Sequence, residues 1–449
     1  MRICTAALIV AGVFTSPVNA QPPQASSAGA RSVDVTGAWR MQDGQLVGFH
    51  RTDASDTGRR FIDFESGASH RLYPSGMNRF TSSDGWTGSS PARISYEFEL
   101  DAEARATTLV IHGTDRTPRR AIRVAVRRDT IAFRSGDITL FGELIRPASG
   151  TGPWPVVVYV HGSDNSGSVD RRWEPYLLAA NGNAMFVFDK RGTGRSGGQP
   201  TQLFARLAGD VNAAARWVAQ QPDIDASRIG LAGFSQGGWV APLAASMNPA
   251  IRFLFVGYGM TMPVAEEDRL EAPLKLRAQG FGDDDVLEFE VLNAALHRAA
   301  RARFANGWTE IDTLLIRYHD RRWLQALPAM ETWAGTMLKM GMPQAKRVIP
   351  ELFTTFVDPF YDPVPTLEGL DIPILWMVAA DDIEAPPGPT IATLERLQRA
   401  GEKIELRVVP GADHGLIEFT TDGTRRTRTR YAPDYFGTMM PWLLRQVQR

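Results

Sequence analysis

The sequence predicts an α/β protein: a doubly wound, mostly parallel sheet with an inserted helical cap, preceded by a small β-rich N-terminal domain. In residues 129–449, apolar strand-like runs alternate with helical segments, an order typical of a mostly parallel sheet covered on both faces. Residues 32–128 hold instead short β-like runs separated by turn clusters. Residues 258–368 are mostly helical in pattern and too long for a simple crossover, so we expect an insertion there.

The individual elements follow from these patterns. Strands of the parallel sheet are expected as continuous apolar runs at residues 138–145, 155–160, 184–188, 229–232, 253–256, 374–378 and 404–409, with helices at 203–220 and 236–246. In the N-terminal domain the clearest strands are 45–50, 94–100 and 108–112, which favours an antiparallel sandwich or open barrel. The cap is expected to contain helices at 270–279, 284–304, 309–326 and 330–340.

Composition excludes some classes of partner. With 449 residues, 43% of them apolar, the chain has ample material for a large core. A formal net charge of −1 argues against a surface built to bind nucleic acid or an anionic membrane.

The N-terminus predicts export. Residues 1–20 combine a basic start, an apolar run and a small-residue end, so we expect a signal peptide cleaved after Ala20 and a periplasmic or secreted protein with no stable membrane span after cleavage. Residues 21–31 are expected to be a disordered lead-in. The single cysteine, Cys4, lies in the leader, which excludes a cysteine nucleophile and cysteine-based metal sites in the mature chain.

A Gly-x-Ser-x-Gly motif provides the candidate nucleophile. Gly233-Phe-Ser-Gln-Gly237 follows an expected strand and opens an expected helix. Such a tight turn pushes the serine out of the sheet, and the flanking glycines let neighbouring backbone approach closely. We therefore expect Ser235 to be the nucleophile; the alternative is an ordinary helix start with a capping serine.

The residues around a second strand end suggest an oxyanion hole. Tyr159-Val-His161-Gly162-Ser163 closes a strand that precedes the nucleophile. The backbone N–H groups of Ser163 and Gln236 are the expected donors to a developing oxyanion. The alternative to an oxyanion hole here is a plain strand-ending turn. His161 itself is expected to be a packed structural histidine.

The acid and base of a triad are expected after the nucleophile. An apolar strand ends in Asp381, Asp382 and Glu384, and the distances from Pro373 and Pro386 favour Asp382. Of the later histidines, His297 and His319 lie in helical patterns of the cap. His414 lies in a short glycine-flanked loop after the last strand, so we expect it to be the general base, in the chain order Ser–Asp–His.

No cofactor or metal is expected. Gly192-Thr-Gly-Arg-Ser-Gly197 matches a dinucleotide-binding pattern, but that pattern alone is weak, and Pro200 delays the next helix. We expect a structural loop near the site, with Asp189 and Arg191 as an internal ion pair. The dispersed histidines show no metal-ligand spacing.

From about residue 138 to the C-terminus the chain resembles the α/β-hydrolase superfamily, and within it the serine-aminopeptidase-like and prolyl-oligopeptidase-like esterases. The motifs that carry the resemblance are Val160-His-Gly-Ser163, Asp189-x-Arg-Gly-x-Gly-x-Ser196, Gly233-Phe-Ser-Gln-Gly237, Tyr361-Asp-Pro363, Asp382 with Pro386, and Asp413-His-Gly415. The resemblance implies acyl transfer through an acyl-enzyme, with Ser235, Asp382, His414 and the backbone of Ser163 and Gln236 at the matching positions.

Two features depart from the family. Ala379 stands where the family often has glycine before the acid. Residues 32–128 are too short for the propeller of true prolyl oligopeptidases, which argues against a peptidase of that design.

The leading functional expectation is hydrolysis of a small carboxylic ester, with the cap shaping an apolar pocket. Its aromatic residues Trp308, Trp323, Trp333 and Phe353 are expected mainly in the core of the cap. An aminopeptidase acting on short peptides is the alternative. It would need an acidic cluster, for which 266–268 and 283–285 are candidates, although such charge runs are usually solvated. A non-catalytic scaffold is the alternative of another class.

Overall fold

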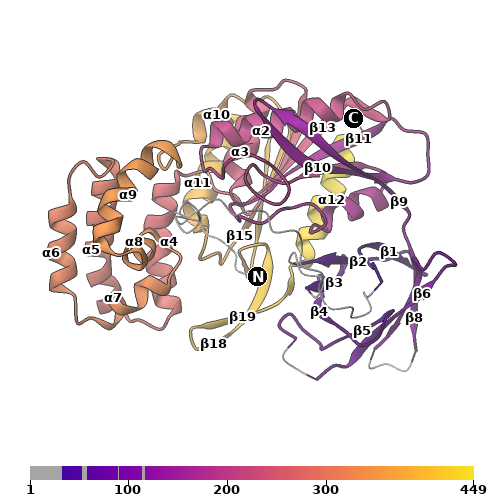
Figure 1. The fold of residues 1–449 in the computed structure, drawn as a ribbon, viewed down its shortest axis with the longest axis horizontal. Coiled ribbons are helices and arrows are strands. Elements are labelled where there is room, and N and C mark those ends of the chain that lie inside the picture. Colours follow the sequence, from indigo (N-terminus) through magenta and orange to yellow (C-terminus); the bar gives the residue numbers. More distant parts are fainter. Residues whose placement is uncertain (1–32, 53–57, 89–90, 114–116, 449) are drawn as a thin grey trace.

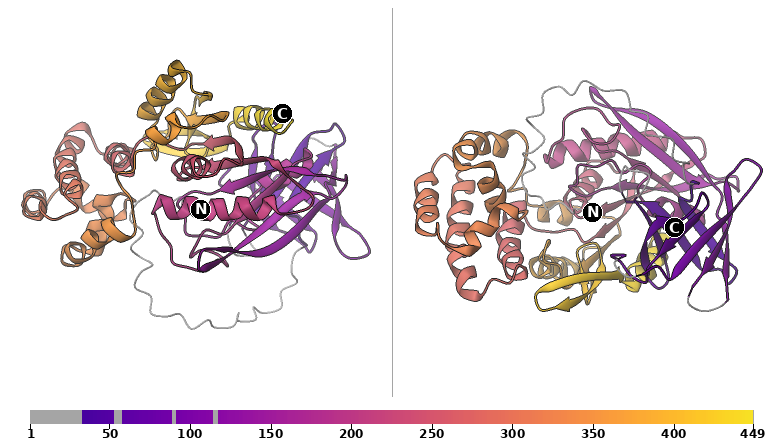
Figure 2. Two further views of the ribbon diagram at one scale, coloured as in Figure 1. Left: turned by 90° about the horizontal axis from the view of Figure 1, so that it is seen from above. Right: turned by 60° about the horizontal axis from the view of Figure 1, so that its bottom comes forward.

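The computed structural model describes residues 33–52, 58–88, 91–113 and 117–448. The expected signal peptide at 1–20 and the lead-in at 21–31 lie outside these described residues. Figure 1 shows three parts: a β-barrel, a large sheet with helices on both faces, and a group of helices at the left. In Figures 1 and 2 the barrel and the helical group lie on opposite sides of the molecule.

The N-terminal domain is a closed barrel rather than the expected sandwich or open barrel. Each strand pairs with the next, and β8 returns to pair antiparallel with β1. The rings of Trp39, Phe49 and Phe98 meet inside it with centroids 5.2 to 6.1 Å apart. The strands are β1 (Gly37–Met41), β2 (Leu46–Arg51), β3 (Arg59–Asp63), β4 (Ser69–Pro74), β5 (Arg79–Ser82), β6 (Ile94–Leu100), β7 (Ala106–His112) and β8 (Arg119–Arg123).

The central sheet has the order β16-β15-β14-β13-β11-β12-β10-β9. All neighbours from β12 to β16 in this order pair in parallel, whereas β10 is antiparallel to both β12 and β9. Its strands are β9 (Val126–Ser135), β10 (Ile138–Pro147), β11 (Trp154–Val160), β12 (Ala184–Phe188), β13 (Ile224–Phe234), β14 (Ile251–Gly257), β15 (Ile374–Ala379) and β16 (Ile404–Val409). Strand β9 starts at Val126, so it spans the expected boundary between residues 128 and 129.

Side chains alternate between the two faces of this sheet, as the period of a strand requires. Val156 and Val158 of β11 belong to one core, with α2 and α3, whereas Val157 and Tyr159 belong to the other, with α1 and α12. The helices around the sheet are α1 (Glu174–Ala180), α2 (Phe204–Ala219), α3 (Gly237–Ser246), α10 (Val364–Glu368), α11 (Pro387–Ala400) and α12 (Pro433–Val447). Burial on both faces explains why the strands are continuous apolar runs.

A helical insertion separates β14 from β15. Its elements are α4 (Val264–Ala278), α5 (Asp283–Arg301), α6 (Trp308–Arg317), α7 (Arg322–Ala326), the 3₁₀ turn η2 (Leu327–Ala329), α8 (Trp333–Met340) and α9 (Met342–Thr355). Trp323, Trp333 and Phe353 are buried within it. In the part of the chain that the structure describes, no helix is both long enough and apolar enough to cross a membrane.

The barrel is joined to the sheet domain through the C-terminal region. A small sheet of β17 (Ala412–Asp413), β18 (Ile417–Asp422) and β19 (Arg425–Tyr431) follows β16. The backbone N–H of Tyr431 donates to the carbonyl oxygen of Gly67 in the barrel, 2.9 Å away. The ring of Phe64 packs on Trp173 and Phe436, with centroids 5.5 and 5.6 Å away.

Candidate active site

Ser235 lies on a strained turn directly after the central strand β13. Its φ of +52° is in the left-handed region, which residues other than glycine rarely adopt. The neighbouring glycines are required by close backbone approaches. A Cβ at Gly233 would lie 2.5 Å from the carbonyl oxygen of Gly237, and one at Gly237 would lie 2.6 Å from that of Val160.

The carboxyl ends of β13, β15 and β16 bring Ser235, Asp382 and His414 together, although they are far apart in sequence. Nε2 of His414 lies 3.1 Å from Oγ of Ser235, and Nδ1 lies 2.8 Å from Oδ2 of Asp382. The other oxygen of Asp382 accepts the backbone N–H groups of Glu384 and Ala385. Because the carboxylate accepts from Nδ1, the tautomer whose Nε2 faces the serine as an acceptor is favoured.

The other candidates for acid and base point elsewhere. Asp381 accepts the backbone N–H of Gly411, and Glu384 pairs with Arg428 at 3.6 Å. His297 contacts Asp268 within the insertion, and His319 is exposed beside Asp320. The three expected residues are therefore the ones that meet at one site.

The electrostatics of His414 favour its protonated form. Burial lowers the pKa of the imidazole, but the carboxylates of Asp382 and Glu384 outweigh burial and raise it from 6.5 to about 9. A base with this pKa is largely protonated at neutral pH and becomes available as the pH rises.

The segment that carries Ser163 lies beside the nucleophile. A Cβ on Gly162 would be 3.4 Å from Cβ of Ser235, so this backbone runs directly past the serine. Ser163 and Gln236 thus border Ser235 from two elements, the loop after β11 and the start of α3. The role of their backbone N–H groups as oxyanion donors stays a prediction.

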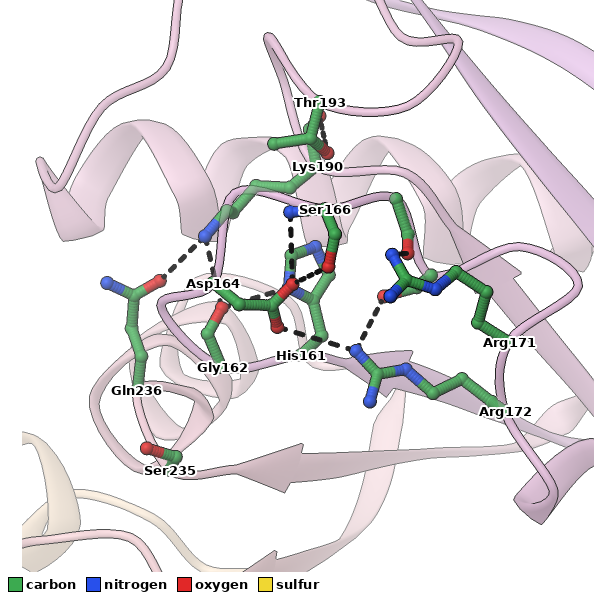
Figure 3. Close-up of polar contacts among 12 residues, drawn as sticks. His161, Gly162, Asp164, Ser166, Arg171, Arg172, Lys190, Thr193, Ser235 and Gln236 are labelled. Carbon is green, nitrogen blue, oxygen red and sulfur yellow. Dashed lines mark hydrogen bonds and ion pairs between the residues drawn. The ribbon is translucent and has the colours of Figure 1, made fainter. Parts of the chain in front are cut away.

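A lysine that the sequence reading missed connects these two elements (Figure 3). Lys190 is buried after β12, and its Nζ donates to the carbonyl oxygen of Gly162 at 3.0 Å and to Oε1 of Gln236 at 3.4 Å. Nδ1 of His161 also donates to the Gly162 carbonyl, at 2.9 Å. Burial and, second, the Lys190 cation lower the pKa of His161 to about 3, so this histidine is neutral and structural.

The loop with the dinucleotide-like pattern is structural, but its expected ion pair is wrong. The carboxylate of Asp189 accepts the backbone N–H groups of Ser168, Val169 and Arg195. Arg191 instead pairs with Asp210, through contacts of 2.6 and 2.7 Å. A carboxylate aimed at backbone donors fixes the loop shape, which spacing in the sequence does not reveal.

A cavity of about 400 Å³ opens beside Ser235. Its walls come from the loop after β11, the start of α1, the C-terminal hairpin and the barrel, which supplies His50 and Arg51 at the end of β2 and Thr52 directly after it. Among its lining residues in the described part of the chain, Tyr258 falls within the expected cap at 258–368, and none belongs to the helices α4 to α9. The barrel therefore contributes more of this cavity wall than the cap helices, which were expected to shape the pocket.

The family is identified by comparison with known proteins. The model of the X-Pro dipeptidyl-peptidase (S15) family matches residues 136–412, more than half of the chain. The chain belongs to this family. The match includes the segments of Ser235, Asp382 and Ser163 and ends at Ala412, just before His414.

Individual relatives of this S15-family chain match over shorter regions. An uncharacterized protein of Mycobacterium tuberculosis is 33% identical over 123 residues, 27% of this chain and 42% of the relative. A thiohydrolase of Aspergillus aculeatus is 31% identical over 102 residues, 22% of this chain and 32% of the relative. The matched region thus spans less than half the length of either curated relative.

Two solved structures are similar at low identity. The acylaminoacyl peptidase of Pyrococcus horikoshii has 14% identity and a TM-score of 0.44, over 92% of this chain and 56% of that one. A Pyrococcus furiosus esterase has 17% identity and a TM-score of 0.45, over 73% of this chain and 92% of that one.

The acidic cluster at 266–268 of this S15-family chain is less exposed to solvent than expected. Glu267 and Asp268 are buried on α4 rather than solvated, as is Glu271, which pairs with Lys275. Burial raises the pKa of Glu267, and the nearby His414 partly offsets that increase. The charges at 283–285 begin α5, where they are largely exposed as expected.

Within the described residues of the S15-family chain, no group of three or more histidine, cysteine, aspartate or glutamate side chains could hold a metal ion.

Proposed function

We propose that this protein is a serine hydrolase that cleaves a small carboxylic ester through an acyl-enzyme on Ser235. The observation that carries this proposal is the continuous set of contacts from Asp382 through His414 to Ser235 at the carboxyl edge of the sheet. The strained backbone of the serine and the nearby N–H groups of Ser163 and Gln236 support it.

In the proposed reaction, neutral His414 accepts the Ser235 proton as Oγ attacks the carbonyl carbon. The N–H groups of Ser163 and Gln236 stabilise the oxyanion of the tetrahedral intermediate. His414 then gives the proton to the leaving alcohol, which departs and leaves the acyl-enzyme. A water molecule, deprotonated by His414, repeats the sequence and releases the acid. Asp382 orients the imidazole and stabilises its cation throughout.

A serine peptidase acting on short peptides is the second candidate. The description of the S15 family, X-Pro dipeptidyl-peptidases, favours it. The charges at the cavity do not separate the two candidates, because Asp164 and Glu174 line it together with Arg51, Arg171 and Arg172. The ester proposal stays first because residues 32–128 are too short for the propeller of a prolyl-oligopeptidase design.

We further propose that the protein is exported, with cleavage after Ala20. The basic start, apolar run and small-residue end of residues 1–20 support this proposal. N-terminal sequencing of protein purified from the producing cells tests it: a mature chain beginning at Gln21 is expected, and a chain beginning at Met1 contradicts it.

Covalent labelling by a fluorophosphonate probe tests the nucleophile, with Ser235→Ala as the control. Labelling of the wild type alone is expected. A folded wild type that never labels contradicts the proposal and favours a scaffold role, and labelling that survives in the variant means that another serine reacts. Parallel assays with aryl esters and X-Pro 4-nitroanilides then separate esterase from peptidase. A kcat/KM that is higher for the anilides would overturn the ester reading.

A further inference from the structure

The cavity beside Ser235 lies where three parts of the chain meet. His50 comes from the barrel, Arg172 and Glu174 come from the segment that opens α1, and Tyr431 comes from the end of β19. Arg171, which precedes α1, links this segment to the barrel by donating to the carbonyl oxygen of Thr52, 2.8 Å away. A substrate group next to the serine would therefore contact the N-terminal barrel directly.

Three of the residues that line this cavity carry buried polar atoms without partners among the residues that the structure describes. Glu174 is only 5% exposed, and its Oε2 accepts no hydrogen bond. His50 is 6% exposed, and its Nδ1 is also unpaired. Nε of Arg172 is a third such atom, although Nη2 of the same guanidinium contacts Ser168 and Asp164. Because such atoms are costly to bury alone, they point to a ligand with complementary donors and acceptors.

Several aromatic rings also line the cavity. The lining includes the rings of Tyr159, Trp173, Phe234, Tyr258 and Tyr435. Phe234 stacks on Tyr159 at 4.8 Å, and Tyr258 meets His414 edge-on at 4.9 Å. Flat aromatic walls around a few polar atoms favour a ring as the bound group.

The charges at this position are mixed, which favours a neutral group over an ion. An ammonium would lie near Arg172, and a carboxylate would lie near Glu174. A hydroxyl satisfies both side chains, because it donates to the carboxylate and accepts from the guanidinium.

We propose that this cavity is the specificity subsite of the enzyme and binds a neutral, hydroxyl-bearing ring of the ester substrate between Glu174, Arg172 and His50. The inference rests on the proposed function, because the ring belongs to the ester that Ser235 attacks. A hydroxylated aromatic ring and a sugar ring share this chemistry, and the choice of substrates distinguishes them.

The first experiment compares matched esters on the wild type. Methyl esters of 4-hydroxyphenyl acids with linkers of increasing length are compared with the same esters lacking the hydroxyl, and with 4-amino-methyl and 4-carboxy analogues. Acetylated methyl glycosides form the sugar series, with their deoxy analogues as controls. Removing the hydroxyl should lower kcat/KM about tenfold or more in one series, and both charged analogues should be poor. Equal kcat/KM with and without the hydroxyl in both series overturns the inference.

Variants then assign the preference to residues. In Glu174→Gln the preference for the hydroxylated ester should fall several-fold, and His50→Phe, which keeps a ring but removes the nitrogen, should reduce it as well. The matched control is His70→Phe, another barrel histidine, whose Nδ1 contacts the hydroxyl of Tyr96 outside the cavity. It should keep the wild-type preference. A preference that is unchanged in both cavity variants, or equally reduced in the control, contradicts the assignment.

The failures of the two proposals differ in outcome. A protein that labels at Ser235 and hydrolyses esters without regard to the hydroxyl refutes the subsite alone. A folded protein that neither labels nor hydrolyses any ester refutes the proposed function. If Glu174→Gln fails to fold, the comparison of esters on the wild type and the His50→Phe variant still test whether the cavity binds the hydroxyl.

Discussion

Replacing Lys190 by methionine tests whether a buried cation holds the oxyanion site together. Lys190 donates to the carbonyl oxygen of Gly162, and that carbonyl belongs to the same peptide unit as the N–H of Ser163. A cation on the oxygen fixes the plane of this peptide and polarises its N–H toward the developing oxyanion. The second contact, to Oε1 of Gln236, ties the other donor residue to the same ammonium (Figure 3).

The size of the effect follows from these contacts. A hydrogen bond from a charged group to a neutral acceptor contributes about 1.5–3 kcal/mol, and a comparable loss in the transition state lowers kcat roughly tenfold to a hundredfold. KM should change much less, because the oxyanion forms only after substrate is bound. Methionine fills a similar volume, so packing is largely kept.

The assay is the kcat and KM of an aryl ester, with circular dichroism to verify folding. Lys190→Arg should recover part of kcat because it restores a charged donor. Thr193→Val is the matched control: its hydroxyl donates to the Lys190 carbonyl oxygen at 2.7 Å, in the same loop, so its loss should leave kcat nearly unchanged. A folded Lys190→Met variant with wild-type kcat, or one whose loss is entirely in KM, would refute the reasoning.

Three further predictions concern His414 and the barrel junction. Because the pKa of His414 is raised to about 9, kcat/KM should rise with pH toward that value, and a flat activity profile above pH 7 contradicts this. The raised pKa also stabilises the folded protein by about 3 kcal/mol. This contribution should be complete below pH 6.5 and should be lost as the pH rises through 9. Glu384→Gln removes a carboxylate that raises this pKa, so the acidic limb of the kcat/KM profile should move to lower pH, and a shift to higher pH would be the wrong sign. Gly67 has a φ of +73°, and a Cβ there would lie 1.9 Å from the carbonyl oxygen of Tyr431, so Gly67→Ala should lower Tm by several degrees. Gly44→Ala is the control and should lower Tm less, because Gly44 also has a positive φ, +91°, but no atom lies within 4 Å of its Cβ position. Equal shifts in Tm would show that the junction is not tight.

The sequence predicted the parts of the site whose signal is local. Ser235 and His414 each lie in a short glycine-bounded motif after an apolar strand, and topology brings such strand ends together. The same reasoning selected Asp382 from neighbouring acids. The direction of a side chain could not be predicted in this way. Asp189 accepts backbone N–H groups rather than pairing with Arg191, and the spacing of residues in the sequence does not distinguish these two arrangements.

The cavity could not be predicted, because its residues share no motif. His50 and Glu174 come from different domains and face one cavity only because the barrel packs on α1 and α12. Buried Glu267 looked like part of a solvated charge run for a similar reason: its burial depends on tertiary packing. Lys190 carried one usable signal, its position directly after a buried strand at the edge where Ser235 also lies.

The contact between Gly67 and Tyr431 has a consequence for biosynthesis. The barrel is built from strands adjacent in sequence and can form early, whereas its partner at this contact is made 364 residues later. His414 likewise follows Ser235 by 179 residues. A chain that stops before residue 412 would hold the barrel strands and Ser235 but neither His414 nor the hairpin of β18 and β19, so it would lack both the proposed base and the contact that joins the barrel to the sheet domain.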